Sequence, residues 1–519
     1  MNFKFSEKEG KNMKKIKNYY SLGEDVNLHN DKEITYELDK NLNDNYRIRI
    51  KKPFKIKITY GNPRSKEYAN NTLNNLIKNN ELKYGLIEDG PSFKLRGIIE
   101  GFYGKPWTHE DRLNVIRFLK KERMNTYMYA PKDDLYHRKK WRVPYPKNEF
   151  ALLKELIKET KNNDIDFYFS ISPGNDFNYT KKEDYDALFN KINEVLNEGV
   201  CNFNLLLDDI DYSLKDSEKK EFETPGKAHA YISNKLNGYL KEKLKEYSLV
   251  MCPTEYWQNY NTPYRQDLKE NLDKNIKVFW TGYKVVPEYI PNIDGDNALK
   301  YFGHDLVLWE NYPVNDMAPD LLFMGPIENR GDKLDKTHIG MVSNPMINWS
   351  LSIIPLKTIA DYMWNPSNYN KEQSYINAIK EFCDNNEEIS SSLINFLDNF
   401  RHSIISYYSN NKIENYIKDD RLDKLIEYYE SILEDIDIIK QLKNKRFLEQ
   451  ISPWFTRFEF DFNLLVLYRE NRIIELEDKL KLTESLKYTI NSNYALKYLK
   501  NKGIYTGKGN RKERINNWE

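Results

Sequence analysis

Cysteine is scarce in this sequence, and the few cysteines are poorly placed for their usual structural uses. Cys201, Cys252 and Cys383 are far apart, odd in number and outside any CxxC pair. This spacing argues against a disulfide framework and against a zinc site. It fits a reducing compartment, and the N-terminal residues contain no apolar stretch typical of a signal peptide. We therefore expect a cytoplasmic protein, although a secreted protein whose leader had been removed would look the same.

Net charge, long apolar runs and nucleotide-binding motifs are also missing. The 80 Lys and Arg residues balance 79 Asp and Glu residues, which gives a net charge of +1. This balance provides no overall field that would attract nucleic acid or an anionic membrane. No stretch approaches the roughly 20 apolar residues of a membrane span, and no GxGxxG or Walker A sequence is found. We expect no nucleic-acid or membrane partner, and the oligomeric state stays open.

The composition that is present indicates a globular protein of about three domains. The chain has 519 residues, of which 39% are hydrophobic and 31% charged, as is typical of globular proteins. Residues 1–92 predict a small N-terminal α/β domain that begins after a loose segment. Its clearest signals are alternating strands over Tyr46–Ile50 and Phe54–Ile58, followed by a helix over Tyr68–Asn79.

Residues 371–519 predict a C-terminal α-helical domain. Apolar residues recur there at helical spacing, as in Leu425, Tyr428 and Ile432. The aromatic residues around Trp454 and Phe458 are expected in the core of a helical bundle rather than on a ligand-binding surface. The basic residues at the C-terminal end are expected to form a frayed tail.

Residues 93–370 alternate between strand-like and helix-like segments. The expected strands are short apolar runs, and they are Leu95–Glu100, Thr126–Ala130, Asp166–Ser172, Phe203–Asp209, Ser248–Thr254, Lys277–Thr281, Leu306–Trp309 and Gly340–Ser343. Amphipathic stretches separate the early ones, namely Glu110–Glu122, Glu149–Thr160, Tyr185–Asn197 and Lys227–Lys243. Eight strands with helical crossovers over about 270 residues predict an α/β fold, a (β/α)8 TIM barrel. A doubly wound open sheet is the main alternative.

The most informative stretch is NFNLLLDDID, from Asn202 to Asp211. Its apolar part indicates a strand buried on both faces, and it leads into two adjacent carboxylates, Asp208 and Asp209. Ionised carboxylates avoid buried positions unless something compensates them. The pair therefore marks a site at the end of the strand, a loop cap or a cation site. An EF-hand is excluded, because Leu214 stands where glycine is needed and Lys220 where glutamate is needed.

The other expected strands also end in polar, aromatic or glycine residues. These strand ends are Glu100–Gly104, Ala130–Asp134, Ser172–Gly174, Asp208–Asp209, Pro253–Tyr256, Trp280–Gly282, Trp309–Asn311 and Ser343–Pro345. Any single one is explained by turn chemistry, which favours several of the same residue types. The carboxyl ends of barrel strands form the active site. Because such residues occur at all eight expected strand ends, we predict one site at that rim.

This set of side chains suits a sugar. Aromatic rings cover the apolar faces of a pyranose, while amides and carboxylates bind its hydroxyl groups. Adjacent Asp residues are too constrained to act from opposite faces of a glycosidic bond as acid and direct nucleophile, which favours substrate assistance by a 2-acetamido group. Two neighbouring carboxyl groups also repel when both are ionised, so one of the two pKa values rises and one group can donate a proton near neutral pH.

Several motifs resemble glycoside hydrolase family 84, which contains bacterial and animal β-N-acetylglucosaminidases, O-GlcNAcases among them. In order along the chain, they are Arg96-Gly97, Glu100–Trp107, Asn125–Tyr127, Tyr129–Asp134, Asp208-Asp209, Pro253–Tyr256, Trp280–Gly282, Trp309, Asn311–Asp316 and Ser343–Pro345. The resemblance covers about residues 93–370. It implies a retaining exo-β-N-acetylglucosaminidase that removes terminal GlcNAc from protein Ser/Thr or from glycans through an oxazoline intermediate.

The resemblance also implies a role for each site residue. Asp208 would orient and polarise the acetamido group, Asp209 would be the general acid and then the base, and Tyr256 would hydrogen-bond at the reacting centre. The implied substrate-binding residues are Gly101, Lys132, Cys252, Thr281, Trp309, Asn311, Asp316 and Asn344. Glu310 departs from the family pattern and is expected to add charge beside the pocket.

No metal or organic cofactor is expected, because substrate assistance supplies the nucleophile and the rim lacks a His/Cys cluster. Asp133 and Asp134 are more consistent with structural roles in their loop than with metal binding. Two other functions stay open: an endo-acting hyaluronidase, which would need an open groove, and a catalytically silent sugar-binding module. The presence of both Asp208 and Asp209 argues against the silent module, since binding alone needs no general acid.

Overall fold

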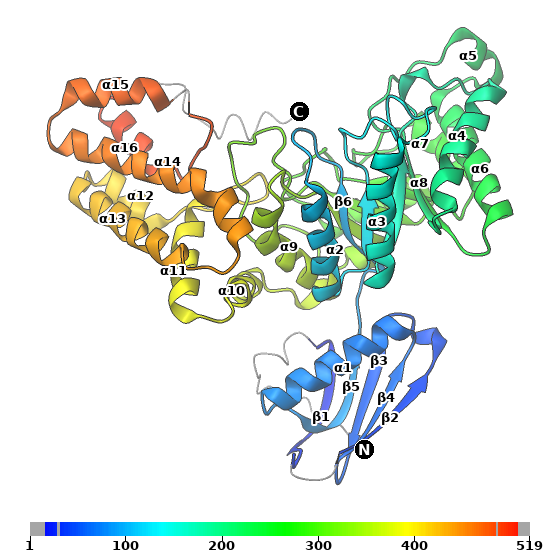
Figure 1. Cartoon of the computed structure of the whole chain (residues 1–519), viewed down its shortest axis with the longest axis horizontal. Coiled ribbons are helices and arrows are strands. Elements are labelled where there is room, and N and C mark those ends of the chain that lie inside the picture. The colour runs from blue at the N-terminus through cyan, green and yellow to red at the C-terminus, as the bar shows by residue number, and fades with distance from the viewer. Residues whose placement is uncertain (1–15, 29–31, 484–485, 507–519) are drawn as a thin grey trace.

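The computed structural model describes residues 16–28, 32–483 and 486–506, and it has three parts (Figure 1). A small N-terminal sheet with one long helix lies below a central barrel, and the C-terminal helices lie to its left in this view. The expected loose N-terminal segment and most of the basic C-terminal tail fall outside the described residues.

The N-terminal part is a mixed sheet with strand order β1-β5-β3-β4-β2, covered on one face by α1. Its elements are β1 (Asn18–Asp25), β2 (Glu33–Leu38), β3 (Tyr46–Lys51), β4 (Lys55–Tyr60), α1 (Pro63–Lys78) and β5 (Lys83–Asp89). The alternation predicted for β3 is confirmed: Tyr46, Ile48 and Ile50 are buried, whereas Arg47 and Arg49 are exposed. The edge strand β2 was not predicted, and most of its side chains are exposed.

The central part is a closed barrel of eight parallel strands, formed entirely within the continuously described residues 95–343. The strands are β6 (Leu95–Glu100), β7 (Thr126–Tyr129), β8 (Asp166–Ile171), β9 (Asn202–Leu206), β10 (Ser248–Cys252), β11 (Lys277–Trp280), β12 (Leu306–Glu310) and β13 (His338–Ser343). The barrel closes through parallel pairing of β13 with β6. The predicted (β/α)8 fold is therefore confirmed. Strand β9 ends at Leu206, so Asp208 and Asp209 follow the strand rather than end it.

Helices surround this barrel in the order expected for the fold. They are α2 (His109–Lys121), α3 (Lys147–Asn162), α4 (Lys182–Leu196), α5 (Asp216–Phe222), α6 (Pro225–Lys243), α7 (Pro263–Asn271), α8 (Asn292–Phe302) and α9 (Trp349–Trp364). One large apolar cluster includes the buried faces of the helices, and a smaller cluster draws on every barrel strand. The smaller cluster includes Ile99, Val250, Val307 and Val342, and it ends at Cys252 and Trp309 under the rim.

The N-terminal part is fixed to the amino ends of the barrel strands. Arg96, near the start of β6, donates to Asp44 (3.0 Å) and to the Tyr68 hydroxyl (3.2 Å). Arg64 of α1 contacts Asp166, the first residue of β8, at 3.2 Å. Contacts at the amino ends of these barrels serve stability, whereas their carboxyl ends carry the site. The N-terminal part therefore covers the end of the barrel away from the predicted site.

The C-terminal part is the predicted bundle of helices. It comprises α10 (Lys371–Phe382), α11 (Glu387–Leu397), α12 (Asn411–Lys418), α13 (Leu422–Ile439), α14 (Lys445–Arg469), α15 (Ile473–Thr483) and α16 (Tyr494–Asn501). Trp454 and Phe458 are buried in its core, as predicted. On α13 the prediction was one residue off, because Tyr429 is the fully buried residue and Tyr428 is half-buried.

The C-terminal core also includes residues from the barrel region. Leu322 and Met324, from the loop after β12, belong to the same apolar cluster as the helices. The Trp454 indole donates to the backbone carbonyl of Asp320 (3.3 Å) in that loop. The helical part therefore supports one of the rim loops. Among the residues that the structure describes, no helix is long and apolar enough to cross a membrane.

Candidate active site

A cavity of about 190 Å³ lies at the carboxyl ends of the barrel strands. Every site residue predicted from the sequence lines it: Gly101, Lys132, Asp208, Asp209, Cys252, Tyr256, Thr281, Trp309, Asn311, Asp316 and Asn344. These residues come from the ends of seven different strands and from the loops that follow them. The barrel closure thus brings together side chains that are up to 243 positions apart, as in the contact of Gly101 with Asn344.

The centre of the cavity is a Lys132 ammonium group shared by two carboxylates. Its Nζ lies 3.5 Å from Asp208 Oδ2 and 3.3 Å from Asp209 Oδ2. The side chains of Lys132 and Asp208 are 9% and 10% exposed, whereas that of Asp209 is 40% exposed. One cation cannot neutralise two ionised carboxylates, so this group of three favours a single bound proton.

The two carboxyl groups differ in their environments, and their pKa values move in opposite directions. Burial raises the pKa of Asp208, and this outweighs the attraction of Lys132. Burial also acts on Asp209, but the charge of Lys132 and the hydrogen bonds from Tyr103 and Lys132 hold its pKa below the usual value. The shared proton therefore favours Asp208 rather than Asp209.

Tyr103 is a site residue that was not among those predicted. Its hydroxyl donates to Asp209 Oδ2, and its backbone N–H donates to Asp316 Oδ2 at 2.7 Å. The ring lies 5.0 Å from the Lys132 ammonium, a cation–π distance. At 46% exposure it is a large aromatic residue open to solvent at the mouth of the cavity. The sequence signal that could have identified Tyr103 is its position in the strand end EGFYG.

One wall of the cavity is a network of amides beside an indole. Asn311 Oδ1 accepts from the Trp309 indole (2.9 Å) and from the Asn344 amide (3.1 Å). The Asn311 amide donates to the Val285 carbonyl at 2.8 Å. Gly101 is required here by space, since a Cβ at this position would lie 2.7 Å from the Trp309 ring. The hydrogen bonds and this close contact fix the orientation of the indole.

The neighbouring strand ends, those of β10 and β11, contribute Tyr256, Cys252 and Thr281 to the cavity. The Tyr256 hydroxyl has no hydrogen-bond partner among the described residues and stays free for a ligand. Burial, with the nearby Asp208 charge, raises the pKa of Tyr256, so the phenol stays protonated as a donor. Burial also raises the pKa of the Cys252 thiol, which makes it an apolar wall rather than a nucleophile. The Thr281 hydroxyl donates to the Lys284 carbonyl at 2.9 Å.

Apolar residues complete the cavity near Asp316. They are Val285, Val286, Val314 and Met317, none of which was predicted. No sequence signal singled them out, because single apolar residues in loops are common. Burial raises the pKa of Asp316, although N–H groups of Tyr103 and Met317 partly stabilise its charge. Asp316 thus offers a hydrogen-bonding carboxyl group at the outer edge of the cavity.

Two acidic residues beside the motifs have structural roles. Asp134 accepts hydrogen bonds from the Tyr129 and Tyr145 hydroxyls at 2.9 and 2.8 Å, so its predicted role within the loop is confirmed. The expectation that Glu310 adds charge beside the pocket is wrong. Its side chain is fully buried and pairs with Arg330 through two hydrogen bonds of 2.7 and 2.8 Å. Among the described residues, no group of three or more His, Cys, Asp or Glu side chains is placed to hold a metal ion.

A (β/α)8 barrel whose rim cavity combines paired carboxyl groups, an indole wall and amides belongs to the class of glycoside hydrolases. A family model described as beta-N-acetylglucosaminidase matches residues 96–398, which is more than half of the 519-residue chain. The chain therefore belongs to the β-N-acetylglucosaminidase family, glycoside hydrolase family 84.

Individual relatives agree with this assignment. The protein O-GlcNAcases of Rattus norvegicus and Mus musculus are each 35% identical to the chain over 282 residues, which is 53% of this chain. The matched region spans 30% of the length of those relatives. Among solved structures, CpGH84B has a TM-score of 0.75 at 30% identity, over 88% of this chain and 86% of its own. A mutant of Thermobaculum terrenum O-GlcNAc hydrolase has a TM-score of 0.71 at 28% identity, over 79% and 94% of the two chains.

Proposed function

We propose that this protein is a retaining exo-β-N-acetylglucosaminidase that removes terminal β-linked GlcNAc from a glycan or a glycoprotein. The observation that carries the proposal is the adjacent pair Asp208 and Asp209 around Lys132, in a cavity closed on one side by Trp309. Family membership supports the same activity.

In the first step, the substrate's acetamido carbonyl oxygen attacks the anomeric carbon. Asp208 accepts the amide N–H and stabilises the positive charge that develops on the acetamido group. The glycosidic C–O bond breaks, and Asp209 gives its proton to the leaving oxygen, as general acid catalysis requires. Trp309 walls the acetyl pocket and the free Tyr256 hydroxyl binds the acetamido oxygen. The products of this step are the free aglycone and an oxazoline that keeps its N–H proton as an oxazolinium ion paired with the Asp208 carboxylate.

In the second step, water replaces the aglycone. The Asp209 carboxylate takes a proton from the water, whose oxygen attacks the anomeric carbon from the face that the aglycone left. The oxazoline opens and the acetamido group is restored. Two inversions at one carbon give net retention, and Asp209 is protonated again. Asp316, Lys132, Asn344 and the Gly101 carbonyl bind the sugar hydroxyls. Asn311 supports the acetamido end, with Cys252 and Thr281 near the acetyl pocket.

The proton must be on Asp209 when the bond breaks, whereas the protein environment favours Asp208. Substrate binding supplies the physical reason for a transfer. An amide N–H that donates to Asp208 favours its ionised form. A sugar over Asp209 removes its water, which favours the protonated form. We infer that binding of the acetamido group moves the proton within the pair.

An exo mode of action is supported by the compact form of the cavity. An endo-acting hyaluronidase would need an open groove for sugar units on both sides of the cleaved bond. The single cavity of about 190 Å³ suits one terminal sugar instead.

The test is release of p-nitrophenol from its β-GlcNAc glycoside, with NMR detection of the anomer formed first. The β anomer supports the proposal, and the α anomer contradicts it. No release at all would favour a silent binding module. Size analysis of digested hyaluronan then separates the exo from the endo mode, since only endo cleavage gives short oligosaccharides early. Activity on a GlcNAc-modified peptide beside chitobiose identifies the natural aglycone.

A further inference from the structure

A second cavity, of about 460 Å³, lies where the three parts of the chain meet. Its walls come from α1, from the residues that end α2, and from the end of α9 with α10. Helices α2 and α9 follow β6 and β13 and run back toward the amino ends of the strands. The cavity therefore lies at the opposite end of the barrel from the candidate active site. Its volume is within the range of roughly 300–1,000 Å³ found for small-molecule sites.

Amide side chains are as frequent as charged ones in the lining of this junction cavity. The amides are Asn75, Asn365, Asn368, Asn370, Gln373 and Asn377. Four carboxylates line the cavity, and each has a partner. Lys357 contacts both Glu122 (2.7 Å) and Glu381 (2.8 Å), Arg401 contacts Glu372 (2.6 Å), and Asp361 accepts from the Ser374 hydroxyl (2.7 Å). An amide offers both a donor and an acceptor, as a sugar hydroxyl does. The lining thus suits a ligand rich in hydroxyl groups.

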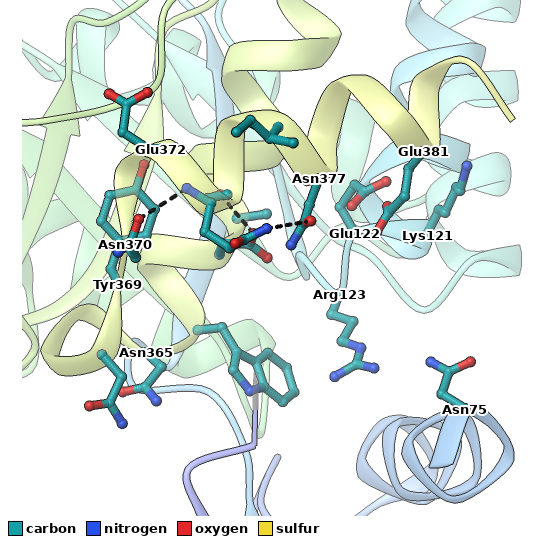
Figure 2. Close-up of a pocket in the computed structure, with 17 residues that line it drawn as sticks. Asn75, Lys121, Glu122, Arg123, Asn365, Tyr369, Asn370, Glu372, Asn377 and Glu381 are labelled. Atoms are coloured by element: carbon teal, nitrogen blue, oxygen red, sulfur yellow. Dashed lines mark hydrogen bonds between the residues drawn. The ribbon is translucent and has the colours of Figure 1, made fainter. Parts of the chain in front are cut away.

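The Arg123 guanidinium of this lining has unused hydrogen-bond donors, although its charge acts on the Asp89 carboxylate. Within the described part of the chain, the Arg123 guanidinium makes no hydrogen bond and no ion pair, and it lies 4.9 Å from the Trp364 ring. The nearby Asp89 carboxylate already accepts two hydrogen bonds, from the Trp364 indole (3.1 Å) and from the Tyr46 hydroxyl (2.8 Å). In Figure 2, Arg123 lies between Asn75 of α1 and Asn377 of α10. Its backbone has φ of +59°, a conformation that favours glycine.

A buried amide in the same lining also lacks a partner. Asn365 is 7% exposed, and its Nδ2 donates to no acceptor among the described residues. Its Oδ1 accepts from the Ser367 hydroxyl at 3.0 Å. A buried donor without a partner is unfavourable and uncommon in native structures. Arg123 and Asn365 are thus two donors in one cavity that a ligand carrying oxygen atoms would satisfy.

We propose that the junction cavity binds an acidic sugar, with its carboxylate on Arg123 and its hydroxyls on the surrounding amides. A guanidinium binds a carboxylate through two parallel hydrogen bonds, which a hydroxyl cannot reproduce. The carboxylate provides specificity, and the amides distinguish the sugar from a simple anion. The site is separate from the candidate active site and does not depend on the proposed hydrolysis.

The test uses the whole chain and isothermal titration with sodium glucuronate, glucose and sodium acetate. We expect glucuronate to bind more tightly than either of the other two. Arg123→Gln should weaken glucuronate binding about tenfold or more, which corresponds to about 1.4 kcal/mol, and should leave glucose binding unchanged. Equal binding of acetate, equal binding of glucose, or no binding of glucuronate would overturn the proposal, as would binding of an acidic peptide alone.

A matched pair on α1 controls for location and folding. Asn75→Asp places a carboxylate in the lining and should weaken glucuronate binding by repulsion. Asn74→Asp adds the same charge to the neighbouring exposed residue, which does not line the cavity, and should have no effect. Equal effects of the two variants would overturn the proposed location. Competitive inhibition of p-nitrophenyl β-GlcNAc hydrolysis by glucuronate would place the ligand in the other cavity and overturn it too.

Discussion

The Tyr103 hydroxyl donates to Asp209 Oδ2, the same oxygen that the Lys132 ammonium contacts at 3.3 Å. A phenol that donates to a carboxylate stabilises its ionised form and so lowers its pKa. Tyr103 is also held by Asp316 through its backbone N–H, so its position depends on two different rim loops. The residue proposed to donate the proton is therefore kept partly ionised by its neighbour.

Tyr103→Phe removes this hydrogen bond without changing the ring. The pKa of Asp209 should rise, so that Asp209 stays protonated to higher pH. The alkaline limb of the kcat profile, which reports groups of the enzyme–substrate complex, should move to higher pH. We expect a loss of activity of less than about tenfold at the optimum, because the phenol is half-exposed. An alkaline limb that stays in place or moves to lower pH would show that Tyr103 does not act on the proton donor.

Asp209→Asn and Asp208→Asn should fail in different ways. Without a proton donor, Asp209→Asn should slow substrates with poor leaving groups by about 10²–10⁴-fold, and activated aryl glycosides far less. Asp208→Asn should slow both kinds of substrate alike, because the acetamido group attacks the anomeric carbon regardless of the leaving group. The measurement is kcat/KM for aryl β-GlcNAc substrates with leaving groups of varied pKa. If Asp208→Asn shows the steeper dependence of kcat/KM on leaving-group pKa, the two roles are reversed. If both variants stay active, the pair is a structural cap.

Asp208 should also link the stability of the fold to pH. Burial raises its pKa, so the folded state binds this proton more tightly than the unfolded chain. That stabilisation is complete below the unfolded pKa of about 3.9 and is lost as the pH rises through the folded pKa. The melting temperature of Asp208→Asn relative to the wild type should therefore increase as the pH rises above about 4. Asp211→Asn, in the same loop but exposed, is the matched control. A constant difference for Asp208→Asn would contradict the assignment.

Glu310→Gln should destabilise the fold without changing the catalytic rate. It leaves Arg330 as an unpaired buried cation, and breaking a buried ion pair costs about 3–5 kcal/mol. Lys182→Ala breaks an exposed pair with Asp186 and should have little effect on stability, because water screens such pairs. Thermal unfolding measures both, and kcat of the folded Glu310 variant should stay near that of the wild type. A loss of kcat with unchanged stability would instead indicate that Glu310 acts at the active-site cavity.

Turnover should persist in excess chelator. The proposed nucleophile is part of the substrate, and the charge in the cavity comes from Lys132 rather than from a metal. The measurement is hydrolysis of the nitrophenyl substrate before and after dialysis against chelator. Loss of activity that a divalent ion restores would contradict the proposal.

The barrel strands could be predicted because each is a short apolar run that is buried on both faces. Their ends then indicated the cavity, since the closure of the barrel, once assumed, brings them together. Strand β2 was not predicted, although Ile34, Tyr36 and Leu38 alternate with polar residues, and most of its side chains are exposed. Glu310 shows a second limit: in the sequence it adjoins a pocket residue, but its side chain turns inward to Arg330, which is 20 positions away.

The junction cavity had no sequence signal at all. It joins Asn75, Arg123 and Asn377, which belong to three separate parts of the chain, and none of them lies in a recognisable motif. Arg123 follows an ordinary helix end, where sequence reasoning expects only a cap. The unused donors of its guanidinium become visible only once the neighbouring helices are in place.

The contact of Trp454 with the carbonyl of Asp320 has a consequence for any shortened form of this protein. The loop that carries Asp316 and Met317 into the cavity continues into Leu322 and Met324, which pack among the C-terminal helices. A fragment cut after the barrel would keep every proposed catalytic side chain but would lose the support of its outer wall. The fragment should therefore show a raised KM rather than a loss of kcat. Adding the helices back as a separate polypeptide should lower that KM again.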